Sequence, residues 1–234
     1  MKRVSIILLS VLAIVAMGNA QNERFDISLH GGLAIPIGSW GEQEIQGQNS
    51  SIWVPNGTTF GLSFNYKITK GNFGLTAMVM QQTNALDTES LARSFNRQNS
   101  FSNISVASGN FKLNQFLIGI SDYYPIADKL SLDIKCLFGA MDIGKPALTI
   151  TDENGSQTYT GSSSLSFVYL VGTGVRYHAN SNLDFLFSVD FIDTNPYFGE
   201  FEYWWDIEPE TNSTSAIDSS ISSLNIKLGV AFKF

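Results

Sequence analysis

Apolar and polar residues alternate along most of this 234-residue chain, and this alternation limits its fold more than any other feature. In the stretch FDISLHGGLAI, Phe25, Ile27 and Leu29 share one face, whereas Asp26 and Ser28 lie on the other. Successive side chains of a β-strand point to opposite faces, so the pattern predicts a strand with one apolar side. It predicts eight strands, over residues 25–35, 58–67, 73–81, 111–123, 130–140, 165–177, 183–191 and 224–234. The fourth has apolar residues on both faces, and its register stays open.

The connections between these strands alternate in length. They are short at 68–72, 125–129 and 179–182, and long at 37–57, 82–110, 141–164 and 192–223. Short turns on one side and long loops on the other are typical of a transmembrane barrel, whose turns face the periplasm. We therefore predict one all-β domain over residues 21–234, an eight-stranded antiparallel up-and-down transmembrane β-barrel.

The first twenty residues, MKRVSIILLSVLAIVAMGNA, have the features of a secretory signal peptide. Two cations precede an apolar run, and small residues end the segment, which predicts cleavage between Ala20 and Gln21. The apolar run is shorter than the roughly 20 residues of a spanning helix, which favours a signal over a membrane anchor. We expect export to a bacterial outer membrane.

The chain ends on KLGVAFKF, with Phe234 still inside the alternation. Lipid cannot hydrogen-bond a free sheet edge, so a barrel survives in it only when closed. We therefore expect the last strand to pair with the first along its whole length.

The same ending resembles the sorting signal of bacterial outer-membrane barrels, in its Lys227, Gly229, Phe232 and Phe234. The stretches LHGGLAIPIGSW and YYPIADKLSLD are similar to the small eight-stranded outer-membrane barrel domains of Bacteroidota type. The resemblance implies contact with outer-membrane lipid and lipopolysaccharide. It also implies recognition of those four residues by the barrel-assembly machinery during biogenesis, and it implies no shared catalytic activity.

Charge and cysteine content exclude several functions. Cleavage removes two cations and no anions, which leaves 12 Lys and Arg against 21 Asp and Glu, a formal charge of −9. Nucleic acid calls for a basic surface, so we expect no nucleic-acid partner. The single cysteine, Cys136, cannot form an intramolecular disulfide, and its apolar strand face favours a packing role.

Charged residues fall on the face of the strands that would point into the barrel. An eight-stranded barrel has room for side chains and little else, so an internal network of salt bridges and hydrogen bonds is expected. A narrow ion path is the alternative. The predicted lumen residues are Asp26, His30, Lys67, Asp133, Lys135, Arg176, Asp184, Asp190, Lys227 and Lys233.

Little in the sequence indicates catalysis. The only histidines are His30, in mid-strand beside two glycines, and His178, beside a short turn. Neither belongs to a nucleophile motif, and Cys and His are too few for a metal site of that type. We predict no enzyme activity, no cofactor and no metal, with a lipid-modifying enzyme kept as the less favoured alternative.

The last long loop combines acid with aromatic residues. Residues 193–220 hold seven carboxylates and no Lys or Arg. Aromatic side chains flanked by acid suit capture of a protein, glycan or cationic ligand, although they also suit an interfacial belt, a strand extension or a Ca²⁺ site without EF-hand spacing. The candidate contact surface is Tyr197, Phe198, Glu200, Glu202, Tyr203, Trp204, Trp205 and Asp206.

In the second long loop, a short helix is expected over residues 88–95. Together these features predict an outer-membrane barrel with a structural or surface-binding role through its four long loops. A narrow pore is the alternative function, and the sequence does not identify the ligand.

Overall fold

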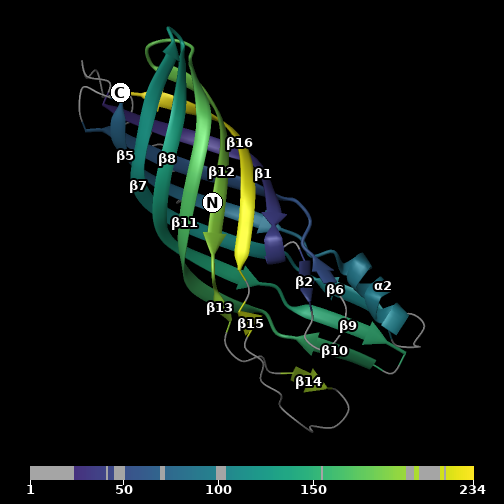
Figure 1. Ribbon diagram of the computed structural model, residues 1–234. Coiled ribbons are helices and arrows are strands. Elements are labelled where there is room, and N and C mark those ends of the chain that lie inside the picture. Colours follow the sequence, from purple (N-terminus) through teal and green to yellow (C-terminus); the bar gives the residue numbers. More distant parts are fainter. Residues whose placement is uncertain are drawn as a thin grey trace, which may run out of the picture.

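The computed structural model describes residues 24–40, 42–44, 51–68, 72–98, 104–153, 155–198, 203–205, 217–218 and 220–234. The predicted signal peptide and its cleavage site at Ala20 and Gln21 lie outside these residues. Eight antiparallel strands close into a barrel in the order β1-β16-β12-β11-β8-β7-β5-β4 (Figure 1). They are β1 (Phe25–Ile37), β4 (Gly57–Lys67), β5 (Phe73–Asn84), β7 (Phe111–Ala127), β8 (Leu130–Lys145), β11 (Ser162–His178), β12 (Leu183–Thr194) and β16 (Ile221–Lys233).

The prediction of an eight-stranded up-and-down barrel is confirmed, because each strand pairs with its neighbour in sequence and β16 returns to β1. The seam runs from Asp26 opposite Lys233 to Ile37 opposite Ser222. Beyond it, the amide of Phe234 donates to the carbonyl of Phe25 at 2.8 Å. The last strand therefore pairs along its whole length, as expected for a sheet without a free edge.

The alternation of the sequence corresponds to the two faces of the barrel wall. In β11, Leu165 and Phe167 are exposed on the outside, whereas Val168 and Leu170 are fully buried inside. Exposed apolar side chains continue around the wall on all eight strands. Cys136 lies on this outer face of β8, with an exposed and free thiol.

The two ends of the barrel differ. At one end, here called the turn end, short turns join the strands, and Arg24 and Phe234 lie there. The opposite end, the loop end, carries further structure beyond the barrel (Figure 1). These elements are η1 (Gly38–Trp40), β2 (Glu42–Glu44), β3 (Ser51–Trp53), α2 (Thr88–Gln98), β6 (Ser105–Ser108), β9 (Leu148–Asp152), β10 (Gly155–Tyr159), β13 (Tyr197–Phe198), β14 (Tyr203–Trp205) and β15 (Ile217–Asp218).

Three long connections combine at the loop end. They contribute the strands of one four-stranded sheet, in the order β14-β10-β9-β6, which we call the loop sheet. Helix α2 confirms the helix expected over residues 88–95 and continues to Gln98. Within the described part of the chain, no helix has both the length and the apolarity to span a membrane.

Candidate functional site

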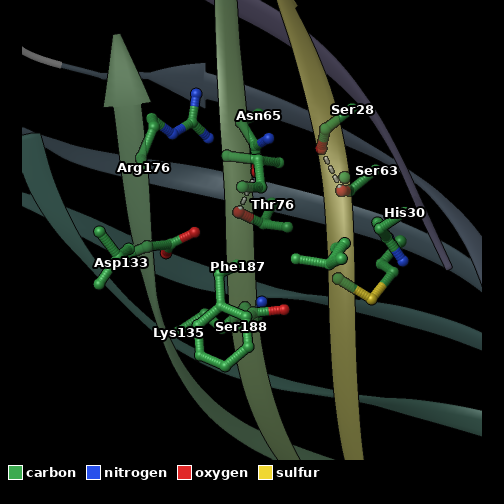
Figure 2. Close-up of a pocket in the computed structure, with 15 residues that line it drawn as sticks. Ser28, His30, Ser63, Asn65, Thr76, Asp133, Lys135, Arg176, Phe187 and Ser188 are labelled. Carbon is green, nitrogen blue, oxygen red and sulfur yellow. Dashed lines mark hydrogen bonds between the residues drawn. The ribbon is translucent and has the colours of Figure 1, made fainter. Parts of the chain in front are cut away.

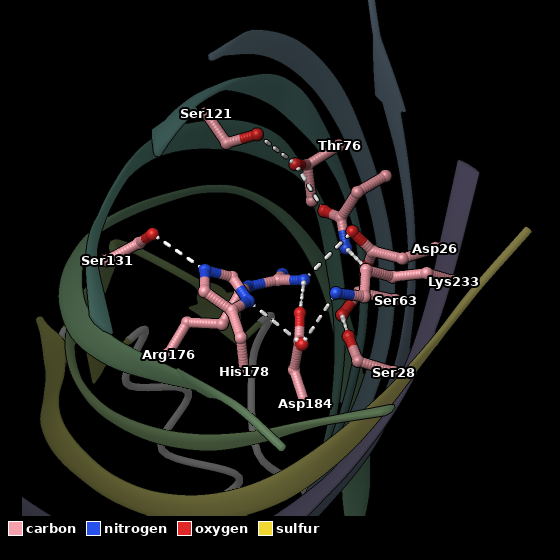
Figure 3. Close-up of polar contacts among 11 residues, drawn as sticks. Asp26, Ser28, Ser63, Thr76, Ser121, Ser131, Arg176, His178, Asp184 and Lys233 are labelled. Carbon is pink, nitrogen blue, oxygen red and sulfur yellow. Dashed lines mark hydrogen bonds and ion pairs between the residues drawn. The ribbon is translucent and has the colours of Figure 1, made fainter. Parts of the chain in front are cut away.

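The lumen at the turn end contains a network of buried charges, the turn-end cluster (Figure 3). Nη1 of Arg176 lies 3.0 Å from Oδ2 of Asp26 and 3.2 Å from Oδ2 of Asp184. Lys233 and His178 each approach Oδ1 of Asp184 at 2.9 Å. Four strands contribute these residues, so the cluster holds together wall segments that are distant in sequence.

A second group of charges, the mid-lumen cluster, lies further from the turn end. The carboxylate of Asp190 on β12 pairs with Lys135 on β8, at 3.1 Å, and with Lys227 on β16. All three side chains are buried, with exposures of 0% for Asp190, 8% for Lys135 and 1% for Lys227. Charges buried this deeply are tolerated only when paired, which explains why one carboxylate lies between two ammonium groups.

Charges of both signs face one another across the lumen. Four inward carboxylates, Asp26, Asp133, Asp184 and Asp190, lie among the cations Lys67, Lys135, Arg176, Lys227 and Lys233. Four of these cations, Lys135, Arg176, Lys227 and Lys233, lie in salt bridges with the carboxylates.

A group of apolar side chains, the apolar layer, follows toward the loop end. Its members come from β5, β7, β8, β11, β12 and β16 and pack together inside the barrel. Trp40 of η1 packs against them from the loop end, edge-on to Phe111 at 6.5 Å between ring centroids. A buried amide group lies beside this layer, where Gln82 accepts from Asn225 at 3.2 Å and donates to Asn84 at 2.9 Å. The layer includes Met78, Met80, Leu113, Leu117, Leu137, Met141, Ile143, Val168, Leu170, Ile192 and Ile221.

The expected internal network of salt bridges and hydrogen bonds is present, and the apolar layer is a second part of the lumen filling that the sequence analysis did not anticipate. Eight of the ten predicted lumen residues are buried, while Asp133 and Lys67 are partly buried. The apolar inner face nevertheless went unrecognised in the sequence. Its signal was the fourth strand, whose open register is now resolved: Leu113 and Leu117 point inward, whereas Phe116 and Ile118 point outward.

His30 lies in the middle of the lumen between two glycines. It is opposite Gly61 on β4 and Gly229 on β16. A Cβ at Gly61 would overlap the imidazole, and one at Gly229 would lie 3.0 Å from Cβ of His30. The glycines on both neighbouring strands therefore leave space for this ring.

His178 forms a chain of contacts that resembles a catalytic triad. Its Nε2 is 2.8 Å from Oγ of Ser131, and its Nδ1 is 2.9 Å from Oδ1 of Asp184. A triad needs these contacts and also an accessible nucleophile. Ser131 is 6% exposed, and Asp184 is shared with Arg176 and Lys233. The arrangement therefore fits a structural role in the turn-end cluster.

The residues predicted to contact the assembly machinery are divided between the two faces of β16. Lys227 and Gly229 point into the lumen, whereas Phe232 is exposed on the outer wall and Phe234 continues beyond the strand. In the closed barrel, Lys227 and Gly229 thus have internal packing roles. Recognition by the assembly machinery stays a prediction.

The predicted contact surface of the last loop is partly described. Tyr197 begins β13 and is 62% exposed, and Phe198 follows it in the same strand. Tyr203, Trp204 and Trp205 form β14, which pairs with β10 in the loop sheet. Glu200, Glu202 and Asp206 lie outside the described residues. The strand extension considered for this loop exists, as part of the loop sheet rather than of the barrel.

The loop sheet has its own small hydrophobic core. Leu91 of α2 is fully buried and packs with Ile104, and Val106, Leu148 and Ile150 of the sheet pack against them. Asp87 precedes the helix and accepts hydrogen bonds from the amide and hydroxyl of Ser90, at 3.0 and 2.7 Å. These bonds hold the pKa of the Asp87 carboxyl below its usual range, the hydroxyl having the larger effect. The loops thus form a folded unit.

Among the described residues, no group of three or more His, Cys, Asp or Glu side chains is arranged to hold a metal ion.

No family model and no curated protein matches the chain. Among solved structures, it is similar to the outer membrane protease OmpT from Escherichia coli, with a TM-score of 0.51 and 9% identity over 94% of this chain and 100% of that chain.

Two other solved structures are similar at lower scores. The attachment invasion locus protein Ail of Yersinia pestis has a TM-score of 0.48 and 14% identity, over 91% of this chain and 100% of that one. Neisserial surface protein A has a TM-score of 0.46 and 16% identity, over 90% and 97%. At these identities the similarity concerns the fold alone, and the chain is thus a closed β-barrel of the kind found among bacterial outer-membrane proteins.

Proposed function

We propose that this protein is an integral outer-membrane barrel with a closed lumen, and that its loop end, which has a folded loop sheet and an acidic last connection, binds an extracellular partner. The observation that carries the proposal is the contrast between the two parts of the molecule. The lumen is filled by paired charges and an apolar layer, whereas three loops combine into a sheet with its own core. Ordering so many loop residues has an entropic cost, which is more readily explained by a binding surface than by passive connections.

The outer wall supports placement in a membrane. Its exposed apolar side chains include Phe60, Phe167 and Leu228, each more than 60% exposed. So large an apolar surface is unfavourable in water and favourable against hydrocarbon. The proposal includes export by a signal peptide ending at Ala20, assembly through the terminal motif, and contact with outer-membrane lipid and lipopolysaccharide. Membership of the Bacteroidota-type barrels stays a prediction.

The charge of the last loop limits the class of partner. Its seven carboxylates and lack of Lys and Arg disfavour polyanions and suit a basic protein, a neutral glycan or another cationic ligand. The filled lumen weighs against the narrow pore. The buried Ser131 likewise weighs against a lipid-modifying enzyme that would use the Ser131–His178–Asp184 contacts.

Membrane placement is tested by comparing the full chain with a variant lacking residues 227–234. We expect only the full chain to enter the outer-membrane fraction and to shift on a gel when heated. A full-length protein that stays soluble in the periplasm would contradict the proposed insertion into the outer membrane.

Surface binding is tested on intact cells with a fluorescent polycation and a fluorescent polyanion. The variant Glu200→Gln/Glu202→Gln/Asp206→Asn removes three loop carboxylates and leaves the barrel unchanged. We expect wild-type cells to retain more polycation than variant cells, with equal polyanion on both. Equal polycation retention, or stepwise conductance of the purified protein in planar bilayers, would argue for another function.

A further inference from the structure

The imidazole of His30 is buried without a hydrogen-bond partner. The residue is 6% exposed, and neither Nδ1 nor Nε2 is bonded to any described residue. A neutral imidazole has one donor and one acceptor, and leaving a buried polar group unpaired costs about 1–3 kcal/mol. The positions directly opposite His30 on the neighbouring strands are Gly61 and Gly229, which have no side chain that could be a partner.

A small cavity lies next to this ring, inside the barrel (Figure 2). Its volume is about 20 Å³, and polar side chains from several strands line it. One of them, Asp133 on the opposite wall, has a buried Oδ1 that also lacks a partner. A polar cavity above roughly 10–15 Å³ is large enough for a water molecule.

We propose that this cavity is a binding site for one or two ordered water molecules, and that at least one of them is hydrogen-bonded to the His30 ring. Size excludes larger ligands. The two cations at the cavity, Lys135 and Arg176, already pair with carboxylates of the lumen, so neither is left to hold an anion. Water can both donate and accept, which is the combination that an unpaired imidazole requires.

The residues that line the cavity are not part of the proposed binding surface at the loop end. Ser28 and Ser63 on the cavity wall are already bonded to each other at 2.7 Å, and Thr76 is bonded to Asn65 and Ser121. Among the residues that the structure describes, the buried side-chain atoms without a hydrogen-bond partner at the cavity are the two ring nitrogens of His30, Oδ1 of Asp133 and Nε of Arg176. Water there would complete the polar filling of the lumen on the turn-end side of the apolar layer.

The chain has only two histidines, which makes the site accessible to NMR. In ¹⁵N-histidine-labelled protein in lipid nanodiscs, the variant His178→Gln assigns the remaining signals to His30. We expect at least one His30 ring nitrogen to have the chemical shift of a hydrogen-bonded nitrogen and a cross-peak to water. Ring nitrogens that are both free, or a bond made directly to a protein carboxylate, would overturn the proposal.

A cavity-filling variant locates the water. Ser188 lines the cavity, so Ser188→Val should displace the water and remove the cross-peak. Thr173→Val makes a similar change on the outer face of β11 and should leave the cross-peak intact. A water cross-peak that survives in folded Ser188→Val would overturn the proposed water site. A change in the His30 chemical shifts when gluconate replaces chloride would also overturn it, because it would indicate a bound ion. If Ser188→Val fails to fold, the wild-type spectrum decides.

Discussion

Nζ of Lys135 lies 3.1 Å from Oδ1 of Asp190, although a whole strand, β11, separates the strands that carry them. The residue of β11 between them is Gly172, which is opposite Asp190 on one side and Lys135 on the other. A Cβ at Gly172 would overlap the carboxylate of Asp190 and would lie 2.7 Å from Cε of Lys135. The salt bridge therefore passes over a position that only glycine can occupy.

The variant Gly172→Ala should break this salt bridge. Its methyl group occupies the space between the two side chains, and the buried charges lose their direct contact. Breaking a buried ion pair costs about 3–5 kcal/mol. We expect a loss of that order in the free energy of unfolding, measured by urea denaturation in lipid vesicles.

A matched control is Gly31→Ala on the outer face. Its nearest neighbours would be the carbonyl oxygen of Thr59 at 3.5 Å and Cδ2 of Phe60 at 3.7 Å, which are ordinary contacts. Alanine is preferred to glycine in a strand interior by roughly 0.5–1 kcal/mol, so this change should be neutral or stabilising. An equal loss in the free energy of unfolding for the two variants would contradict the claim that the space above Gly172 is needed for the salt bridge.

Asp190→Asn should destabilise the barrel by a different route. The substitution keeps the shape of the side chain but leaves Lys135 and Lys227 buried without their shared counter-ion. Removing one member of a buried pair costs about 3–5 kcal/mol. The comparison is Asp142→Asn on the outer wall, where the exposed carboxylate accepts a long bond of 3.4 Å from Asn114. A change within about 0.5 kcal/mol is expected there. Similar unfolding midpoints for both variants would contradict the importance of the mid-lumen cluster.

The barrel was predictable from sequence because its outer face has to be apolar at nearly every second residue. That requirement produces the alternation in strands such as β12, where Phe185 and Phe187 face out and Asp184 and Asp190 face in. The requirement does not apply to the inner face. In β8, Leu137 and Met141 are buried inside while Ile134 and Phe138 are exposed outside, and the alternation weakens where both faces are apolar. The apolar layer was missed for this reason.

The pairings that complete the lumen and the loop sheet depend on register and distant contacts. Lys135 and Asp190 are 55 residues apart, and their contact becomes visible only once Gly172 is known to lie between them. The strands of the loop sheet have three to five residues, too few for a periodic signal. Helix α2 was predictable because its capping and amphipathic pattern are local.

Ser131 should not behave as a nucleophile despite its contact with His178. A fluorophosphonate probe reacts with an activated serine that it can reach, and Ser131 is buried in the lumen wall. We expect no labelling of the folded barrel, with a serine esterase in the same vesicles as the positive control. Labelling of the wild type that disappears in both Ser131→Ala and His178→Gln would establish a catalytic site instead.

The capping of α2 should depend on pH through Asp87. The hydrogen bonds from Ser90 favour the ionised carboxylate and lower its pKa in the folded loop below the ordinary value of 3.8. A group whose pKa is lowered on folding contributes stability above its unfolded pKa, and this contribution is lost as the pH falls through the folded pKa. Protection of the α2 amides against hydrogen exchange should therefore be constant from pH 7 to about 4.5 and decrease below pH 4, after correction for intrinsic exchange rates.

Two variants separate the charge of Asp87 from its capping bond. Asn also caps helices, so Asp87→Asn should keep substantial protection and remove the decrease below pH 4. Asp87→Ala should lose about 1 kcal/mol of local stability at every pH, since the alanine cannot accept from the Ser90 amide. The barrel amides serve as the internal reference, because this cap lies beyond the barrel at the loop end. A decrease in protection that persists in Asp87→Asn would assign the pH dependence to another group.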